Sequence, residues 1–173
     1  MRLTTVLAAC LLACGTPWPV LADGDLRGAV KAEGPSLSAA AGRFVLVEEL
    51  DDPYLVGLQY RGVPRTGWSL RPGIGADIAD DDLLFVYGDV AREFALPRRW
   101  FVTLSFGAGR FANGERVGAD YSLQFRSGIS VARRLASGRR LGLAGYHISN
   151  GGLDQPNDGT ETVVLFLALP VSR

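Results

Sequence analysis

Three residues near the C-terminal end of the chain carry the side chains of a serine hydrolase. His147 and Ser149 are two residues apart, and Glu161 follows His147 by 14 residues. A hydroxyl becomes an effective nucleophile when an imidazole accepts its proton and a carboxylate orients that imidazole. The three residue types therefore match a nucleophile, a general base and an orienting acid, provided that the fold brings them to one surface.

The chain around these residues is dominated by an alternation of apolar and polar side chains. Between Trp100 and Gly109, for example, large apolar residues mostly alternate with Thr, Ser and Gly. A period of two sustained over about ten residues predicts a long β-strand. Residues 23–42, rich in Gly, Ala and Ser, are expected to form a loose N-terminal lead. Eight strand segments are expected after it, at 43–50, 54–61, 68–78, 83–94, 99–109, 121–133, 139–150 and 161–170.

Two kinds of β-barrel fit such strands, and the polar faces distinguish them. A soluble barrel buries its apolar face, whereas a membrane barrel turns that face to lipid and fills its lumen with small or polar side chains. The polar faces here are rich in glycine and carry single mid-strand charges at Arg71, Asp77 and Arg126. We therefore predict an all-β fold, an eight-stranded antiparallel transmembrane β-barrel, in preference to a soluble barrel.

In such a barrel the hydrolase side chains face lipid. His147 and Ser149 lie on the same face of their strand as Leu141 and Leu143, because side chains alternate along a strand. Glu161 likewise shares its parity with Val163 and the apolar residues after it. If 150–160 is the hairpin loop, Glu161 lies opposite Ser149 and diagonal to His147, within reach for long side chains.

The depth of this group follows from the topology. With both termini in the periplasm, the seventh strand runs outward, so that the loop after it lies outside the cell. Polar groups on a lipid-facing surface are expensive unless they are satisfied, and they tend to be functional. The alternative is that a histidine beside a serine at a barrel rim is only an interfacial residue without a catalytic role. Asn-Gly-Gly is then an ordinary turn sequence.

The same stretch resembles the outer-membrane lipid A 3-O-deacylases. The resemblance lies in His147-x-Ser149-Asn150-x-Gly152-Leu153, followed by Gln155-Pro156-Asn157-Asp158-Gly159-x-Glu161. Phe125, on the lipid face of the preceding strand, fits a further family position. Strong similarity covers about 121–170, and earlier strands match in pattern only.

The resemblance implies hydrolysis of the ester-linked 3-hydroxyacyl chain at position 3 of lipid A, with no metal and no cofactor. Ser149 would attack the carbonyl, His147 would accept its proton, and Glu161 would hold the imidazole. Asn150, with backbone amides around Gly151 and Gly152, would stabilise the oxyanion. Asn157 would fix the loop, and Phe125 is a candidate substrate contact.

The N-terminus predicts export. A positive start at Arg2 and an apolar run to Leu12, ended by prolines, are typical of a secretory signal peptide over residues 1–22. Residues 23–173 then form the barrel domain. Both cysteines of the chain lie in the removed segment, which leaves no disulfide in the mature protein. The alternative is a lipoprotein signal that lipidates Cys14.

Composition excludes several other functions. Lys plus Arg and Asp plus Glu both number 18, so no net basic field exists to hold a nucleic acid. One histidine and two cysteines exclude a Cys/His zinc site, and a hydrophobic content of 47% argues against disorder. The expected partners are lipopolysaccharide and outer-membrane lipid, and the oligomeric state stays open, a homodimer included.

Three functions compete with the deacylase reading. One is a non-enzymatic outer-membrane barrel with a structural or lipid-binding role, and another is a soluble periplasmic lipid carrier. A phospholipase with the same three residues is a variant within the enzyme class, separable by its substrate.

Overall fold

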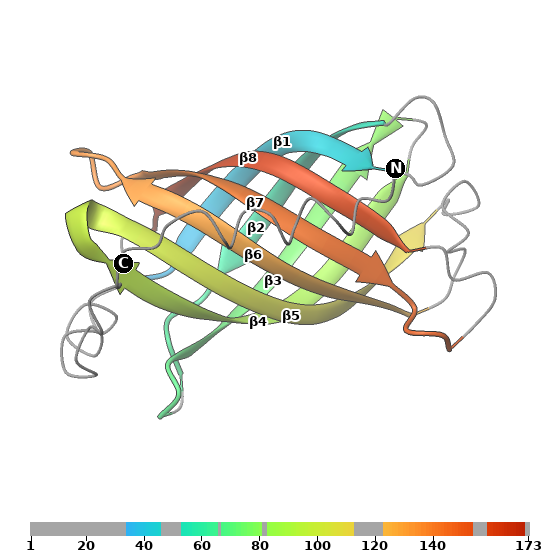
Figure 1. The fold of residues 1–173 in the computed structure, drawn as a ribbon, viewed down its shortest axis with the longest axis horizontal. Helices are drawn as coiled ribbons and strands as arrows, with labels where there is room; N and C mark the ends of the chain where they lie inside the picture. The colour runs from blue at the N-terminus through green and yellow to red at the C-terminus, as the bar shows by residue number, and fades with distance from the viewer. Residues whose placement is uncertain are drawn as a thin grey trace, which may run out of the picture.

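The computed structural model describes residues 34–45, 53–65, 67–80, 83–112, 123–153 and 159–171. The eight strands form one closed antiparallel barrel in chain order, with β1 also paired to β8. Figure 1 shows β1, in blue, lying beside β8, in red, where the barrel closes. The fold class predicted from the alternation, an eight-stranded antiparallel barrel, is confirmed. No helix among the described residues is long and apolar enough to cross a membrane.

The strands are long and are joined at two distinct ends. The strands are β1 Ser36–Val45, β2 Tyr54–Arg61, β3 Leu70–Ala79, β4 Leu84–Leu96, β5 Trp100–Ala112, β6 Gln124–Arg134, β7 Arg140–Ser149 and β8 Thr160–Pro170. We call the end that carries the connections after β1, β3, β5 and β7 the loop end. The other end, with the connections after β2, β4 and β6, also holds the start of β1 and the finish of β8, and we call it the turn end.

The first strand is the main correction to the sequence analysis. It runs over Ser36–Val45, not over 43–50, so part of the expected loose lead 23–42 is a barrel strand. Ser, Ala and Gly favour strands only weakly, which hid this segment from propensity. Backbone ladders to β2 on one side and β8 on the other hold it in place. The third strand also begins later than expected, at Leu70, because Trp68 lies in a turn.

The remaining N-terminal predictions lie outside the described residues. This applies to the signal peptide over 1–22 and to the alternative lipid attachment at Cys14.

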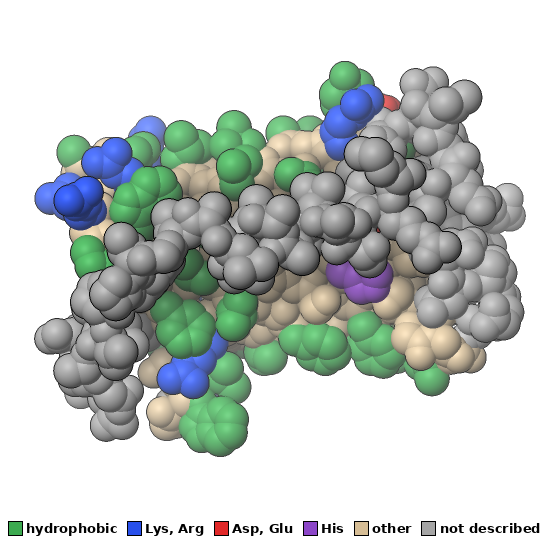
Figure 2. All heavy atoms as spheres, viewed as in Figure 1, with side chains coloured by type: hydrophobic (Ala, Val, Ile, Leu, Met, Phe, Trp, Pro, Cys, Tyr) green, Lys and Arg blue, Asp and Glu red, His purple; other side chains and the backbone are tan. Residues whose placement is uncertain are grey.

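The barrel is inside-out relative to a soluble protein, as the faces predicted. Its exterior carries large exposed apolar side chains on every strand from β2 to β8, including Leu58, Ile74, Leu143 and Leu165. Figure 2 shows hydrophobic side chains, in green, along the visible parts of the barrel wall. Arg71, Asp77 and Arg126, the mid-strand charges, are instead buried in the lumen. This is the distribution of a barrel whose outer surface contacts lipid.

The lumen is filled by paired charges. In its middle, Arg61 Nη2 lies 2.9 Å from Asp89 Oδ2. The Arg126 guanidinium lies 3.8 Å from Asp89 and 3.9 Å from Asp77. That guanidinium is also stacked between two rings, 3.3 Å from the centroid of Tyr146 and 4.0 Å from that of Tyr87. Opposite charges and π-faces offset the desolvation of these groups.

A second charged layer lies nearer the turn end. Glu93 Oε2 is 2.6 Å from Arg140 Nη1 and 3.4 Å from Arg71 Nη1. Arg71 also donates to the carbonyl of Gly34, at 2.8 Å, which ties the residues before β1 to the lumen.

Lumen glycines leave room for these large side chains. A Cβ at Gly75 would lie 2.5 Å from the Tyr87 ring, and one at Gly128 would collide with Tyr146. The glycine-rich faces of the sequence are therefore packing faces.

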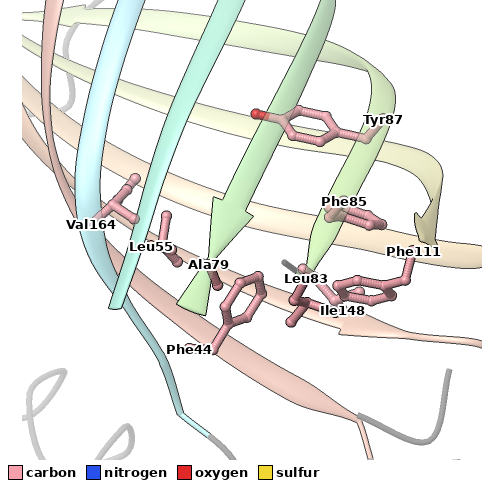
Figure 3. Close-up of a cluster of buried hydrophobic side chains, with 10 residues drawn as sticks. Phe44, Leu55, Ala79, Leu83, Phe85, Tyr87, Phe111, Ile148 and Val164 are labelled. Carbon is pink, nitrogen blue, oxygen red and sulfur yellow. The ribbon is translucent and has the colours of Figure 1, made fainter. Parts of the chain in front are cut away.

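At the loop end an apolar cluster closes the lumen. It contains the aromatic rings of Phe44, Phe85 and Phe111, with Ile148 and Val164 among the aliphatic members. Figure 3 shows these side chains converging from several strands toward the barrel interior. The ring centroids of Phe85 and Phe111 are 4.5 Å apart. Because Ile148 of β7 belongs to this cluster, the packing fixes the position of the β7 backbone at the loop end.

Candidate active site

The outer face of β7 presents His147 and Ser149 at the loop end. Ile148, between them, points inward into the apolar cluster and is 1% exposed. His147 points outward, with 51% of its side chain exposed, on the same face as Leu141 and Leu143. Figure 2 shows this histidine, in purple, on the outer surface. The expected outward direction of the pair is confirmed.

Glu161 of β8 completes a close contact with the histidine. Its Oε1 lies 3.2 Å from His147 Nδ1, and 43% of the Glu161 side chain is exposed. Both groups belong to the outer surface of the barrel. With Nδ1 directed to the carboxylate, the other ring nitrogen, Nε2, is left for a second partner.

The pairing of β7 with β8 differs from the expected register. Glu161 lies directly opposite His147, and the last pair is Ile148 with Thr160. The expected placement of Glu161 opposite Ser149 is therefore wrong by two residues. Gly159, with φ of 63°, departs from extended backbone and ends the ladder there. A shift of two residues keeps every side chain on its predicted face.

Phe125 flanks Ser149 from the other side. The two residues are directly opposite each other on β6 and β7. The Phe125 ring is stacked with that of Phe106 of β5, with centroids 6.1 Å apart and planes inclined by 14°. Phe106 is 57% exposed, so the pair forms an apolar wall on the outer surface beside the serine. Phe125 was predicted from the sequence as a substrate contact, and Phe106 was not, although its outward position in the alternation of β5 was the available signal.

The turn after β7 is shaped by Asn150 and two glycines. Asn150 is 2% exposed, and its Oδ1 accepts a hydrogen bond of 2.8 Å from the Gly152 amide. Gly151 and Gly152 have φ of 66° and 82°, which favour glycine. A Cβ at Gly151 would lie 3.3 Å from the Phe125 ring, so the turn folds back over that ring. Asn157 lies outside the described residues.

Serine, imidazole and carboxylate therefore share one exposed surface, beside an aromatic wall and against a closed lumen. Such a group can perform acyl transfer on a substrate that approaches from the side of the barrel. Among the described residues, no group of three or more His, Cys, Asp or Glu side chains could hold a metal ion.

Comparisons with known proteins identify similar sequences. The profile of the lipid A 3-O-deacylase (PagL) family matches residues 56–170. The lipid A deacylase PagL of Pseudomonas aeruginosa is 38% identical over 74 residues, which are 41% of this chain and 42% of that protein. The alignment thus spans less than half of the length of that relative.

Solved structures share the fold. The crystal structure of the outer membrane enzyme PagL matches with a TM-score of 0.61 and 24% identity, over 79% of this chain and 99% of that one. Neisserial surface protein A matches with a TM-score of 0.57 and 10% identity, over 79% and 96% of the two chains. A designed transmembrane β-barrel matches with a TM-score of 0.56 and 12% identity, over 79% and 94%.

Proposed function

Because the chain belongs to the lipid A 3-O-deacylase (PagL) family, we propose that it hydrolyses the ester of the acyl chain at position 3 of lipid A. The protein is an outer-membrane β-barrel, and its apolar exterior suits that location. The observation that carries the proposal is the 3.2 Å contact between His147 Nδ1 and Glu161 Oε1 on the outer surface. The packing of the barrel does not explain a polar pair on this lipid-facing surface, because the lumen charges and the apolar cluster lie on the inner side of the wall.

Each of the three residues has a distinct role in the proposed mechanism. Glu161 accepts the Nδ1 proton of His147 in a hydrogen bond, which fixes the tautomer with a free lone pair on Nε2. Nε2 removes the proton of Ser149 as its Oγ attacks the ester carbonyl. The protonated imidazole then gives that proton to the departing sugar oxygen, leaving an acyl-serine. Water, activated by the same imidazole, releases the 3-hydroxy fatty acid and restores the serine.

We infer that the turn after β7 supplies the oxyanion donors. Asn150 acts as a loop support, since its Oδ1 already receives the Gly152 amide. The amide of Gly151 is then the more direct donor to the oxyanion, because the Gly152 amide already donates to Asn150 Oδ1. A donor of this kind contributes about 10²–10³ in rate. Asn157, outside the described residues, stays a proposed support of the same loop.

The proposed substrate lies in the outer leaflet at the loop end. Lipid A fills that leaflet, and its esters lie near the headgroup boundary. The Phe106 and Phe125 rings offer an apolar surface to an acyl chain beside Ser149. The substrate would thus approach laterally with its chains still in the membrane. We further propose that residues 1–22 are a signal peptide removed on export and that residues 23–173 form the barrel domain.

The deciding experiment is mass spectrometry of lipid A from cells with and without the protein. We expect a loss of mass equal to one 3-hydroxyacyl group in cells that express it. The Ser149→Ala variant, at equal amounts of folded protein in the membrane, should leave lipid A intact. Unchanged lipid A with the wild-type protein would instead favour a structural or lipid-binding barrel. Release of fatty acid from phospholipid alone would identify a phospholipase.

A further inference from the structure

The turn end of the barrel, away from the candidate active site, carries a cluster of arginines. The turns after β4 and β6 are neighbours there, because Trp100 is paired with Arg133 across β5 and β6. An open hollow lies between the two turns, and we call it the arginine hollow. Its lining residues are Arg98, Arg99, Arg133, Arg134, Leu135 and Ala136. Figure 2 shows most of the visible arginine side chains, in blue, toward the end of the barrel away from the purple histidine.

Two of these cations, Arg98 and Arg99, have no carboxylate partner in the part of the chain that the structure describes. The arginines of the lumen, by contrast, are paired with carboxylates: Arg61, Arg71, Arg126 and Arg140. Arg98 and Arg99 are exposed at the surface and form no such pair with a described residue. A cluster of exposed guanidinium groups attracts anions, and a guanidinium can bind a phosphate through two parallel hydrogen bonds.

The backbone of the turn after β4 is unfavourable for arginine. Arg98 and Arg99 have φ of 61° and 67°, in the left-handed region that favours glycine. A non-glycine residue there carries a backbone penalty. Turn geometry alone would be satisfied better by glycine or asparagine. The two side chains are therefore better explained by what they bind than by how the turn folds.

The hollow lies where a membrane barrel meets the headgroup region. Trp100, 39% exposed, begins β5 beside it, and the Arg133 guanidinium lies 6.0 Å from the Trp100 ring centroid. Leu135, also 39% exposed, adds an apolar side chain to the lining. Tryptophan is enriched at membrane–water interfaces, where one part of its ring is apolar and another is wet. Arginines beside apolar side chains at the membrane–water interface match a lipid that has an anionic headgroup and apolar chains.

We propose that the arginine hollow binds the phosphodiester headgroup of an anionic phospholipid of the phosphatidylglycerol type. Because the proposed function places the candidate active site in the outer leaflet, the turn end lies in the inner leaflet, and the lipid is a phospholipid of that leaflet and not the lipid A substrate. Arg98 and Arg99 contact the phosphate from one turn and Arg133 from the other. The acyl chains run along the apolar outer face of β5 and β6.

Tryptophan quenching by brominated lipid tests this binding. The chain has three tryptophans. Trp18 lies in the proposed signal peptide, so Trp100 is the only tryptophan left in a mature Trp68→Phe protein. The protein is inserted in phosphatidylcholine vesicles that contain a minor fraction of one lipid brominated near its headgroup. At equal bromine content, phosphatidylglycerol should quench Trp100 more strongly than phosphatidylcholine. Each arginine near an anionic surface strengthens binding to anionic lipid by about fivefold, so a clear excess of quenching by phosphatidylglycerol is expected.

A pair of matched variants separates a site from a general charge effect. Arg98→Gln/Arg99→Gln should remove the excess quenching by phosphatidylglycerol. Arg43→Gln/Arg110→Gln removes the same charge from exposed positions at the loop end and should retain it. Equal quenching by the two brominated lipids in the parent protein would overturn the proposal. So would an equal loss in both double variants, because the attraction would then follow net charge alone.

Discussion

The backbone of Gly159 lies against the His147 imidazole. A Cβ built on Gly159 would stand 3.1 Å from His147 Cε1 and 3.8 Å from Nε2. Gly159 also has φ of 63° and is the residue at which the ladder between β7 and β8 stops. The end of the loop thus bounds the space beside the ring nitrogen that the proposed mechanism uses. Glu161 holds the imidazole from the other nitrogen, so the ring is held on both sides.

The first prediction is that Gly159→Ala lowers turnover while leaving the barrel folded. The new methyl must displace the ring or the loop by a few tenths of an ångström, and misplacement of a base by about 1 Å is enough for a loss on the order of 10²-fold. The measurement is fatty acid released from lipid A per folded protein, with folding scored by the gel shift between heated and unheated samples.

Gly138→Ala is the matched control for this change. Gly138, in the turn after β6, has φ of 80°, and nothing lies within 4 Å of a Cβ built on it. Gly138→Ala therefore imposes a similar backbone penalty, about 1–2 kcal/mol, far from His147. Turnover should be unchanged in Gly138→Ala. If both variants lost activity equally, backbone strain and not ring position would be the cause.

The strands could be predicted from the sequence where large apolar side chains alternate clearly with side chains of another type. β4, for instance, alternates Phe85, Tyr87 and Asp89 inward with Val86 and Val90 outward, and its face follows from the sequence alone. β1 was not predictable in this way, because its residues alternate mainly between small side chains. Its position depends on ladders to β2 and β8, residues distant in sequence, which propensity does not contain.

The second prediction concerns the lipid face. Leu165 is 54% exposed near the middle of β8, opposite Ala41 and Leu143 of its neighbours. Leu165→Arg should lower the free energy of unfolding by about 2–4 kcal/mol, because it takes a charge to the bilayer midplane. Leu169→Arg, near the turn end, should cost only about 0–1 kcal/mol. Denaturant titration in lipid vesicles measures both, and equal effects would contradict the lipid-facing assignment.

The third prediction concerns the lumen. Arg126 is the cation paired with Asp77, at 3.9 Å, and it also lies between the Tyr87 and Tyr146 rings. Arg126→Leu leaves the Asp77 carboxylate buried beside a new apolar group and should destabilise the barrel by about 3–5 kcal/mol. Arg126→Leu/Asp77→Asn should recover part of this loss, since the uncompensated charge is gone. The same denaturant titration applies. A double variant no more stable than the single one would show that the loss of ring stacking, not the uncompensated Asp77 charge, causes the destabilisation.

The candidate site could be predicted in its residues but not in its register. The alternation of β7 fixes the outward direction of His147 and Ser149, and by the same rule it turns Asn150 inward. Parity alone could therefore have separated Asn150, a loop support, from the outward pair. The pairing of Glu161 with His147 depends on where Gly159 ends the ladder, and sequence spacing does not determine a loop conformation.

The fourth prediction is that Ser149 and His147 act as one unit. Ser149→Ala removes the group that bonds to the acyl chain, and His147→Ala removes the group that moves its proton. Each should abolish most of the deacylation, and the double variant should be little worse than either single one, because effects in such a unit are not additive. The gel shift should persist in all three variants, since both side chains point away from the lumen. Additive losses would indicate that the two residues act separately, and full activity in Ser149→Ala would end the serine-hydrolase proposal.

The last prediction ranks Glu161 below the other two. Glu161 contacts the imidazole through the 3.2 Å approach to Nδ1, and in the proposed mechanism it orients and stabilises the ring without bonding to the substrate. Glu161→Ala should therefore leave more residual activity than Ser149→Ala. Glu161→Gln should also be impaired, because an amide can bond the ring but carries no charge to stabilise the imidazolium formed in the transition state. Since substrate contacts are unaffected, both Glu161 variants should lose kcat with little change in KM. A wild-type kcat in Glu161→Ala, at an equal amount of folded protein, would show that the contact between His147 and Glu161 has no catalytic role.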